Sequence, residues 1–217
     1  MTLPPEALAE IALRAVLPLP GARKLIALAG PPGAGKTTMA AHLAKALQGA
    51  GRGAVVVPMD GFHLDNRVLN ARGLSDRKGA PETFDAAGFC HLVARIAAGE
   101  ADIAYPIFDR TRDIAIAGAA CLSAETEFVL FEGNYLLLDA APWRDLARHW
   151  TYTIWIGTDL TDLDARLMRR WRDEGLSDHS ARLKLDGNDL PNIRLVLDHS
   201  VAADLDLSAT GSRPPDG

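Results

Sequence analysis

The stretch GPPGAGKTT, residues 30–38, decides the fold of this chain. It matches the pattern G-x-x-x-x-G-K-[ST] and lies between a short apolar run, residues 24–29, and a segment rich in helix-forming residues, 36–48. Between a strand and a helix, small residues let backbone N–H groups converge on phosphate oxygens, and the helix N-terminus adds positive potential. We therefore predict a phosphate-binding loop, whose members are Gly30, Pro31, Pro32, Gly33, Ala34, Gly35, Lys36, Thr37 and Thr38.

Two polar side chains of this loop have separate predicted tasks. Lys36 is placed to reach the β- and γ-phosphates of a nucleotide, and the hydroxyl of Thr37 is placed to hold Mg²⁺. The alternative is a glycine-rich turn that precedes a lysine by chance, and the flanking strand and helix argue against it. The expected cofactors are therefore ATP and Mg²⁺.

Strands and helices alternate along the rest of the chain. Five short apolar runs predict strands, at residues 24–29, 54–59, 127–131, 152–156 and 203–207. Helical spacing of apolar residues predicts helices, at about residues 5–17, 36–48, 86–98, 159–173 and 192–200. This alternation is typical of an α/β fold, here a five-stranded parallel sheet with helices on both faces.

The length suits one domain. The chain has 217 residues, of which 48% are hydrophobic and 24% charged, enough for a sizeable core. We expect a single domain over residues 1–208 and a disordered tail over 209–217, which is rich in Pro, Gly and Ser. Two excursions, at about 60–85 and 102–118, interrupt the pattern, and long excursions in compact domains usually carry function.

Composition restricts the partners. A net charge of −5 without a basic block disfavours a dedicated nucleic-acid binder. The N-terminus has neither the basic nor the apolar region of an export signal, and no stretch approaches the roughly 18 apolar residues of a membrane span. We expect a soluble, cytoplasmic protein without membrane insertion. Cys90 and Cys121 lack metal-ligand spacing and are predicted to be buried, reduced thiols.

Polar side chains follow three of the predicted strands. Lys36 comes after the first strand, Asp60 after the second, and Glu132 after the third, within FVLFEGNY. In an open α/β sheet the ligand crevice lies outside the carboxyl ends of the strands, so these three groups are expected to converge. Glu132 is expected to bind Mg²⁺, directly or through a water molecule. A turn residue before Gly133 is the alternative.

Three classes of nucleotide-binding protein compete at this point. The guanine-reading N-K-x-D type of sequence found in GTPases is missing after Trp155, and no signature motif of a transport ATPase is present. The sequence therefore favours a kinase, in which a hydroxyl of a small molecule accepts the γ-phosphate of ATP.

The chain resembles the P-loop kinase family that includes uridine kinase, phosphoribulokinase and type I pantothenate kinase. The likeness covers most of residues 22–208 and rests on GPPGAGKTT, MDGFHLDN, KGAPETFD, FDR, FEGNYLLL and an arginine-rich helix. Within the family it looks most like bacterial kinase-like members associated with sugar transport. The resemblance implies the P-loop NTPase fold, with both excursions at the acceptor site and a lid over about 166–185.

The resemblance also implies roles for the first excursion. Asp60, in a D-[GS]-F type of sequence, corresponds to the general base for the accepting hydroxyl, with a water-mediated Mg²⁺ contact as the alternative. Phe62 and His63 fall where the family lines its acceptor pocket, although a lone histidine is more often structural. Phe84-Asp85 matches a pair that holds sugar hydroxyls in related nucleoside kinases, while Asp85 also suits a helix N-cap. The two roles of Asp85 are compatible.

In the second excursion, the stretch from Tyr105 to Arg110 resembles the family's P-x-[FY]-D segment. In the family this segment packs over the acceptor. Tyr105 is accordingly expected at the acceptor site. Arg110 and Arg112 are expected to pair with an acidic or phosphorylated substrate, with a solvated hairpin tip as the alternative. Uridine kinases carry a histidine shortly after the aspartate of this segment, and none follows Asp109 here, which weakens the uridine interpretation.

Four arginines lie where the family's lid closes over the phosphates: Arg166, Arg169, Arg170 and Arg172. Lid arginines stabilise the charge that spreads over the transferring phosphoryl group. Arg169 and Arg170 are the expected contacts, without a choice between them. The alternative is that all four are surface charges.

The sequence therefore predicts a phosphotransferase that moves the γ-phosphate of ATP to a hydroxyl of a nucleoside, a sugar or a pantothenate-like compound. Pantothenate kinase proper is one alternative, favoured by KGAPETFD and DGFH and disfavoured by the short chain. A catalytically weak nucleotide-binding regulator linked to sugar transport is another. The acceptor, the preference for ATP over GTP and the oligomeric state stay open, a homodimer included.

Overall fold

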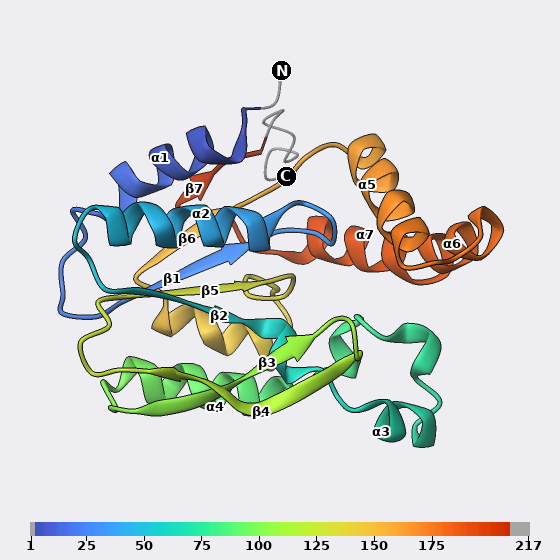
Figure 1. The fold of residues 1–217 in the computed structure, drawn as a ribbon, viewed down its shortest axis with the longest axis horizontal. Coiled ribbons are helices and arrows are strands. Elements are labelled where there is room, and N and C mark those ends of the chain that lie inside the picture. Colours follow the sequence, from blue (N-terminus) through green and yellow to red (C-terminus); the bar gives the residue numbers. More distant parts are fainter. Residues whose placement is uncertain (1–2, 209–217) are drawn as a thin grey trace.

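A five-stranded sheet forms the centre of the molecule (Figure 1). The structure, a computed structural model, describes residues 3–208, so the predicted tail at 209–217 lies outside the described residues. The strands are ordered β2-β5-β1-β6-β7 and pair in parallel throughout. Their bounds are β1 Lys24–Ala29, β2 Ala54–Pro58, β5 Phe128–Gly133, β6 Tyr152–Trp155 and β7 Leu205–Asp206. The predicted α/β fold with a five-stranded parallel sheet is confirmed.

Helices cover both faces of this sheet. On one face lie α1 and α2, with bounds Pro5–Val16 and Lys36–Gly49. On the other lie α4, Ala86–Ala97, and a 3-10 helix, Trp143–His149. Every residue of β1 and β5 is buried, which explains why these strands read as continuous apolar runs rather than alternating ones.

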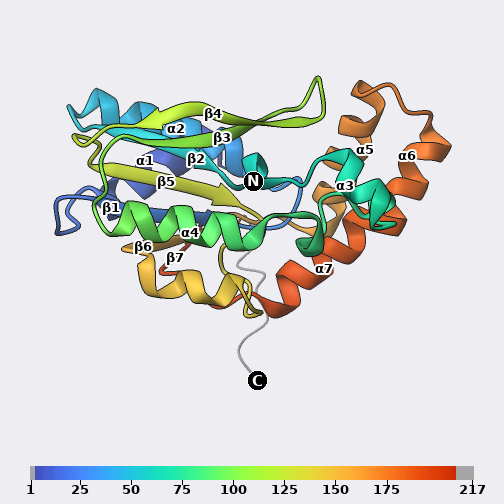
Figure 2. The ribbon, with the colours of Figure 1, turned by 90° about the horizontal axis from the view of Figure 1, so that it is seen from below.

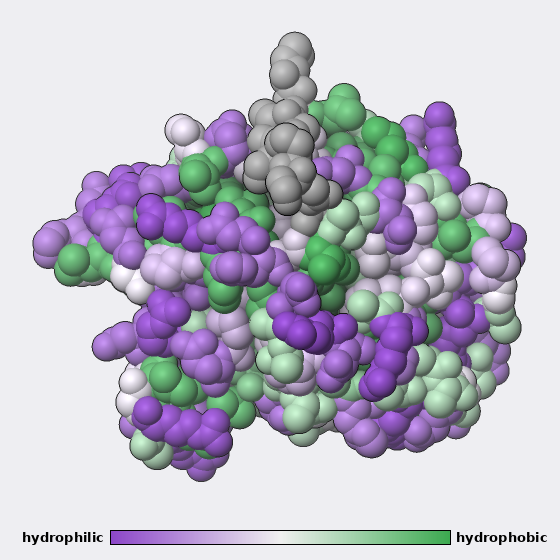
Figure 3. Space-filling view, turned by 180° about the vertical axis from the view of Figure 1, so that it is seen from behind, coloured by the Kyte–Doolittle hydropathy of each residue, from purple (hydrophilic) through white to green (hydrophobic). Residues whose placement is uncertain are grey.

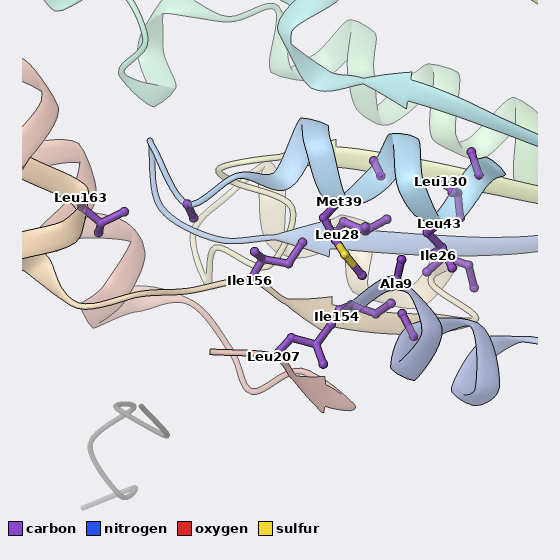
Figure 4. Packing of buried hydrophobic residues seen from close by; sticks show 14 of the residues in the cluster. Ala9, Ile26, Leu28, Met39, Leu43, Leu130, Ile154, Ile156, Leu163 and Leu207 are labelled. Carbon is purple, nitrogen blue, oxygen red and sulfur yellow. The ribbon is translucent and has the colours of Figure 1, made fainter. Parts of the chain in front are cut away.

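The core beneath α1 and α2 is built from side chains of these helices and of the strands that they cover (Figure 4). Ala9 of α1 and Met39 and Leu43 of α2 pack towards Ile26 and Leu28 of β1. All five side chains are nearly inaccessible to solvent. This packing fixes the start of α2, and therefore the phosphate-binding loop, against the carboxyl end of β1.

The two excursions form structures of their own. The first contains α3, Asn66–Ala71, and short 3-10 turns at Ser75–Arg77 and Pro81–Thr83, none of which the sequence analysis predicted. Asp65 caps α3 by accepting from the backbone N–H of Arg67 at 2.9 Å. The second excursion is a two-stranded ribbon, in which β3, Ile103–Asp109, pairs antiparallel with β4, Ile114–Leu122.

A helical arm completes the fold. It consists of α5, Leu160–Asp173; α6, Asp178–Lys184; a π-helix, Leu185–Asp189; and α7, Leu190–His199. The arm and the excursion that carries α3 project from the same end of the sheet, where the strands finish (Figure 2). Seen from behind, a notch in the outline separates these two projections (Figure 3).

Two further expectations concern burial and membranes. Cys90 is half-buried, but Cys121 is exposed, so the prediction of a buried thiol is wrong for Cys121. Cys121 lies on β4, and alternate residues of a two-stranded ribbon face solvent. Within residues 3–208, no helix has the length and apolar character that a membrane crossing requires.

Candidate functional site

A cavity of about 900 Å³ opens at the carboxyl edge of the sheet, in the region of the notch. It has three walls. The loop wall contains Lys36, Thr37 and Glu132; the excursion wall contains Asp60, His63, Asn66, Lys78, Phe108 and Arg110; and the arm wall contains Arg166, Arg170, Trp171, Lys184 and Asp189. The polar groups that follow β1, β2 and β5 therefore do converge, as the topology of a parallel sheet predicts.

The loop wall has the backbone geometry that a phosphate requires. Gly33 and Gly35 have φ angles of 80° and 94°, a left-handed conformation that glycine adopts without strain. Gly30 approaches the residue after β6 so closely that a Cβ there would lie 1.9 Å from the carbonyl oxygen of Ile156. The chain then enters α2 at Lys36, which leaves the N–H groups of the first turn free of helical partners.

Not every residue of the predicted loop faces the cavity. Pro32, Gly33, Gly35, Lys36, Thr37 and Thr38 line it, whereas Gly30, Pro31 and Ala34 do not. The latter three shape the loop from behind. The carbonyl of Pro31 accepts a hydrogen bond from Lys36 Nζ at 2.9 Å, and Ala34 is buried in the core beneath α2.

Lys36 is held in an unusual electrostatic setting. Its side chain is buried, and burial lowers the pKa of Lys36 to about 8, although the charges of Glu132 and Asp60 act to raise it. A buried ammonium that donates to a neutral backbone carbonyl is poised to accept an anionic partner. The terminal phosphates of a nucleotide are such a partner.

Glu132 lies at the end of β5 beside Thr37, whose Oγ1 donates to Glu132 Oε1 at 3.2 Å. Burial, and secondarily the charge of Asp60, raises the pKa of Glu132 to about 7. A carboxylate and a hydroxyl oxygen side by side are ligands that suit Mg²⁺, which usually takes one or two protein groups and completes its shell with water and phosphate oxygens. Residues 3–208 contain no cluster of three or more His, Cys, Asp or Glu side chains that could hold a metal without such help.

Asp60 occupies a 3-10 helix, Met59–Phe62, that begins directly after β2. Gly61 permits the close approach of this turn to β3, because a Cβ at Gly61 would lie 2.3 Å from the carbonyl oxygen of Pro106. Arg110 reaches across from the β3–β4 ribbon, and its Nη2 donates to Asp60 Oδ2 at 2.7 Å. The two excursions thus meet at this carboxylate.

His63 stands beside Asp60 between two aromatic rings. Its ring stacks on Phe84 at a centroid distance of 4.0 Å and lies 4.8 Å from Phe108. Burial lowers the pKa of His63 to about 4, against the opposing charge of Asp60, so the ring is neutral at physiological pH. The Nδ1 atom is buried without a hydrogen-bond partner in the described part of the chain, and His63 Nε2 lies 3.8 Å from Asp60 Oδ1.

Lys78 joins the two excursions and was not predicted as a site residue. Its Nζ contacts Asp113 Oδ1 at 2.8 Å and Asn66 Oδ1 at 2.7 Å, and it lies 5.2 Å from the centroid of the Phe108 ring. The segment KGAPETFD, which carries the family resemblance, begins at Lys78 and was the available signal. The amide of Asn188 in the arm donates to the Lys78 carbonyl at 2.8 Å. Lys78 is therefore anchored from both sides of the cavity.

The arm wall contains a different pair of arginines from the predicted one. Arg170 lines the cavity as expected, but Arg169 is exposed and lies outside it, while Arg166 lines it and approaches the carbonyl of Ala34 at 3.4 Å. Successive residues of a helix point about 100° apart, so Arg169 and Arg170 cannot share one direction, whereas Arg166 and Arg170, four residues apart, do. Arg172 pairs with Asp178 at 2.7 Å, within the arm.

Trp171 is the centre of the arm wall, and no sequence pattern indicated it. Its Nε1 donates to the buried carboxylate of Asp189 at 2.6 Å. The cations of Arg170 and Lys184 lie 4.4 Å and 4.1 Å from the Trp171 ring centroid. Burial raises the pKa of Asp189. The contacts link α5 to the π-helix and hold the cationic side chains at the cavity surface.

Two of the predicted substrate-binding residues, Phe62 and Tyr105, lie behind the cavity rather than on it. Phe62 packs edge-on against Phe89 of α4 at 5.2 Å. The hydroxyl of Tyr105 donates to the carbonyl of Val56 in β2 at 3.1 Å, and the residue is buried. Both support the excursion wall from the core.

Asp85 and Arg112 likewise have partners elsewhere. The Asp85 side chain caps α4 by accepting from the N–H of Gly88 at 2.9 Å, which is the helix-capping alternative. Arg112 pairs with Asp109 at 2.7 Å, within the tip of the ribbon. Of the two arginines expected to meet an acidic substrate, the structure brings only Arg110 to the cavity.

A protein-family model matches the greater part of the chain. The model described as Phosphoribulokinase / Uridine kinase family matches residues 25–174. This range contains the whole phosphate-binding loop, Asp60, both excursions, Glu132 and α5. The match therefore includes all three walls of the cavity, except for the part of the arm that follows α5.

Two known proteins are similar along most of their length. The uncharacterized protein YggC of Escherichia coli is 34% identical over 200 residues, which cover 88% of this chain and 80% of that protein. A putative uridine kinase of Schizosaccharomyces pombe is 32% identical over 194 residues, which cover 85% of this chain and 83% of that protein.

A solved structure extends the likeness to the fold. The crystal structure of a putative fructose transport system kinase from Silicibacter sp. TM1040 superposes with a TM-score of 0.84 and is 47% identical. The similarity covers 94% of this chain and 98% of that one. The excursions and the arm therefore belong to the shared architecture.

Proposed function

The chain belongs to the phosphoribulokinase / uridine kinase family and is a kinase, and from this premise we propose that it transfers the γ-phosphate of ATP, with Mg²⁺, to a hydroxyl of a small metabolite. The observation that carries the proposal is the convergence of Lys36, Asp60 and Glu132 on one cavity. Their charges act on one another, since Asp60 raises the pKa of Glu132 and opposes the fall in the pKa of Lys36.

Lys36 and the loop amides hold the donor in this mechanism. The backbone N–H groups at the start of α2 surround the phosphates, and Lys36 exchanges the Pro31 carbonyl for the β- and γ-phosphate oxygens. Burial of Lys36 favours this exchange because an ammonium in a low-dielectric setting gains more from an anion than from a neutral carbonyl.

Thr37 and Glu132 fit the metal. When bound, Mg²⁺ would neutralise the charge that develops on the phosphates. Thr37 would offer its hydroxyl and Glu132 a carboxylate oxygen, directly or through water. A nearby dication favours the ionised carboxylate, so Glu132 would be deprotonated in the loaded enzyme at physiological pH.

Asp60 acts as the general base. The acceptor hydroxyl gives its proton to the Asp60 carboxylate while its oxygen forms a bond to the γ-phosphorus. The bond between that phosphorus and the β–γ bridging oxygen breaks, and ADP leaves. Arg166 and Arg170, on the arm wall, are the cations placed to stabilise the charge on the transferring group.

The acceptor occupies the space between the excursion wall and the arm wall. His63 offers a neutral ring to it, and Asn66 and Lys78 frame it from the excursion side. We place the activity in the cytoplasm, where ATP is available as the donor.

An acceptor screen tests the proposal. ADP release is measured in a coupled assay over nucleosides, pantothenate, hydroxy acids, sugars and sugar phosphates, and the product is identified by mass spectrometry. Stimulation of ADP release by one compound, together with a phosphorylated product, supports the kinase function. Tight binding of Mg·ATP without turnover of any acceptor would instead support a nucleotide-binding regulator linked to sugar transport.

A further inference from the structure

One cation on the excursion wall is paired with the group that must serve as the base. Arg110 Nη2 lies 2.7 Å from Asp60 Oδ2, and Asp60 is the partner that the structure gives to the Arg110 guanidinium among residues 3–208. Arg110 belongs to the ribbon and Asp60 to the turn after β2, so this contact closes one excursion upon the other. The Arg110 side chain is 58% exposed and the Asp60 side chain 25%.

The ion pair between Arg110 and Asp60 opposes the proposed chemistry unless Arg110 leaves Asp60 for another anion. A guanidinium hydrogen-bonded to Asp60 Oδ2 occupies one of the two carboxylate oxygens to which the acceptor hydroxyl would donate. Once Asp60 has taken the proton of the acceptor hydroxyl, it is neutral and no longer a counter-ion. Arg110 is then free to pair with another anion during the step in which phosphate is transferred.

The neighbouring carboxylates are already engaged. Asp113 contacts Lys78 at 2.8 Å, and Asp109 contacts Arg112 at 2.7 Å. Glu132 is buried beside Thr37 on the loop wall, and Thr37 Oγ1 donates to it. With these carboxylates engaged, a further anion for Arg110 comes from a ligand, and the acceptor is the ligand that occupies the excursion wall on which Arg110 lies, whereas the donor phosphates occupy the loop wall.

The surroundings of His63 indicate which uncharged group the ligand carries beside that anion. Its side chain is 10% exposed, its ring is flanked by Phe84 and Phe108, and Nδ1 has no hydrogen-bond partner among the described residues. A neutral imidazole between aromatic rings suits a hydroxyl group better than a charge, because it supplies one hydrogen-bonding atom and no counter-charge. The excursion wall thus presents a cation and, beside it, the uncharged ring of His63.

We propose, building on the phosphotransferase function above, that the acceptor is a small polyol that carries an anionic group, a carboxylate or a phosphate, and that this group draws Arg110 away from Asp60. The exchange is feasible because Arg110 is more than half exposed, and exposed ion pairs are weakly held. Carboxylates and phosphates both match the guanidinium fork with two parallel hydrogen bonds. Neutral sugars and nucleosides leave Arg110 on Asp60 and are poor acceptors.

Matched pairs of acceptors test this proposal. The pairs are gluconate with sorbitol, glycerate with glycerol, and fructose 6-phosphate with fructose, so that the first two probe a carboxylate and the third a phosphate. With the wild-type enzyme and Mg·ATP, kcat/KM is expected to be at least about 10-fold higher for the charged member of one pair, which is the scale of a charge-assisted hydrogen bond. Equal or better turnover of the neutral members would overturn the proposal and leave the kinase function intact.

Variants assign the effect to Arg110. Arg110→Gln is expected to raise KM for the charged acceptor about 10- to 100-fold and to abolish the preference for charge, while Arg110→Lys recovers part of it. The control is Arg144→Gln, since Arg144 is 56% exposed, pairs with Asp139 at 3.4 Å and lies outside the cavity. Thermal unfolding of each variant separates loss of recognition from loss of folding. A charge preference unchanged in Arg110→Gln would contradict the assignment.

Binding measurements separate the two proposals if no acceptor is turned over. The same six compounds are titrated calorimetrically into the enzyme with Mg²⁺ and a non-transferable ATP analogue. Binding of charged compounds that Arg110→Gln weakens would retain the ligand class while the phosphotransferase function fails. Absence of both turnover and binding for all six compounds would overturn the proposal as well.

Discussion

Glu132 is expected to destabilise the ligand-free protein as the pH rises, and Glu132→Gln should remove that effect. The carboxyl group is 5% exposed, and burial, assisted by the charge of Asp60, raises its pKa from 4.5 to about 7. The folded state therefore holds this proton more tightly than the unfolded state. The stability that this carboxyl contributes is fully present below pH 4.5 and is lost as the pH rises through 7.

The magnitude follows from the interval between the two pKa values. One pH unit corresponds to about 1.4 kcal/mol, so the interval from 4.5 to about 7 corresponds to about 3 kcal/mol of unfolding free energy. Glutamine has nearly the same shape and does not titrate. As the pH rises from 4.5 to about 7, the unfolding free energy of Glu132→Gln should therefore increase by about 3 kcal/mol relative to that of the wild type.

Urea unfolding of both proteins, without nucleotide or metal, measures this difference across the interval. His63 acts in the opposite direction, because its pKa is lowered to about 4 and its contribution grows as the pH rises from 4 to 6.5. That contribution is present in both proteins and cancels in the comparison. The pH is kept at or below about 7, because Lys36, with a pKa of about 8, titrates above that value. A difference in stability that does not change with pH would refute the reasoning.

Three further outcomes are expected. Affinity for Mg·ATP, measured by calorimetry, should be highest between about pH 7 and 8, because Glu132, with a pKa of about 7, must lose its proton to bind Mg²⁺ and Lys36, with a pKa of about 8, must keep its proton to attract phosphate; a flat profile across pH 8 would contradict the role of Lys36. Gly61→Ala should lower the unfolding free energy in urea by about 1–3 kcal/mol, because its Cβ would lie 2.3 Å from the Pro106 carbonyl oxygen, and unchanged stability would disprove this close approach. Trp171→Phe should cost about 1–3 kcal/mol in the same assay by leaving the buried carboxylate of Asp189 without its donor, whereas a neutral effect would mean that the carboxylate finds another partner.

The sequence was sufficient for those parts of the fold that depend on local pattern. The loop at residues 30–38 predicted β1 and α2 because its function requires a strand before it and a helix after it. The apolar run at 127–131 predicted β5, which is buried on both faces. The insertion of β5 between β2 and β1 depends on crossover geometry and left no trace in the strand sequences.

The candidate site was predictable where residues follow strand ends and less so where side chains come from helices or excursions. Asp60 and Glu132 reach the cavity because their strands end there. Arg169 was misplaced because the helical phase of α5 is set by packing of Leu163 and Leu167 rather than by the arginines themselves. Trp171 could not be identified, since its importance comes from contacts with a later segment of the chain.

Asp60→Asn tests the central claim most directly. The substitution keeps the shape of the side chain and removes the carboxylate that is proposed to take the acceptor's proton. Affinity for Mg·ATP, measured by calorimetry, should stay close to that of the wild type, whereas phosphotransfer to the acceptor found in the screen should fall by about 10²- to 10⁴-fold. Phosphotransfer at a near wild-type rate would contradict the account.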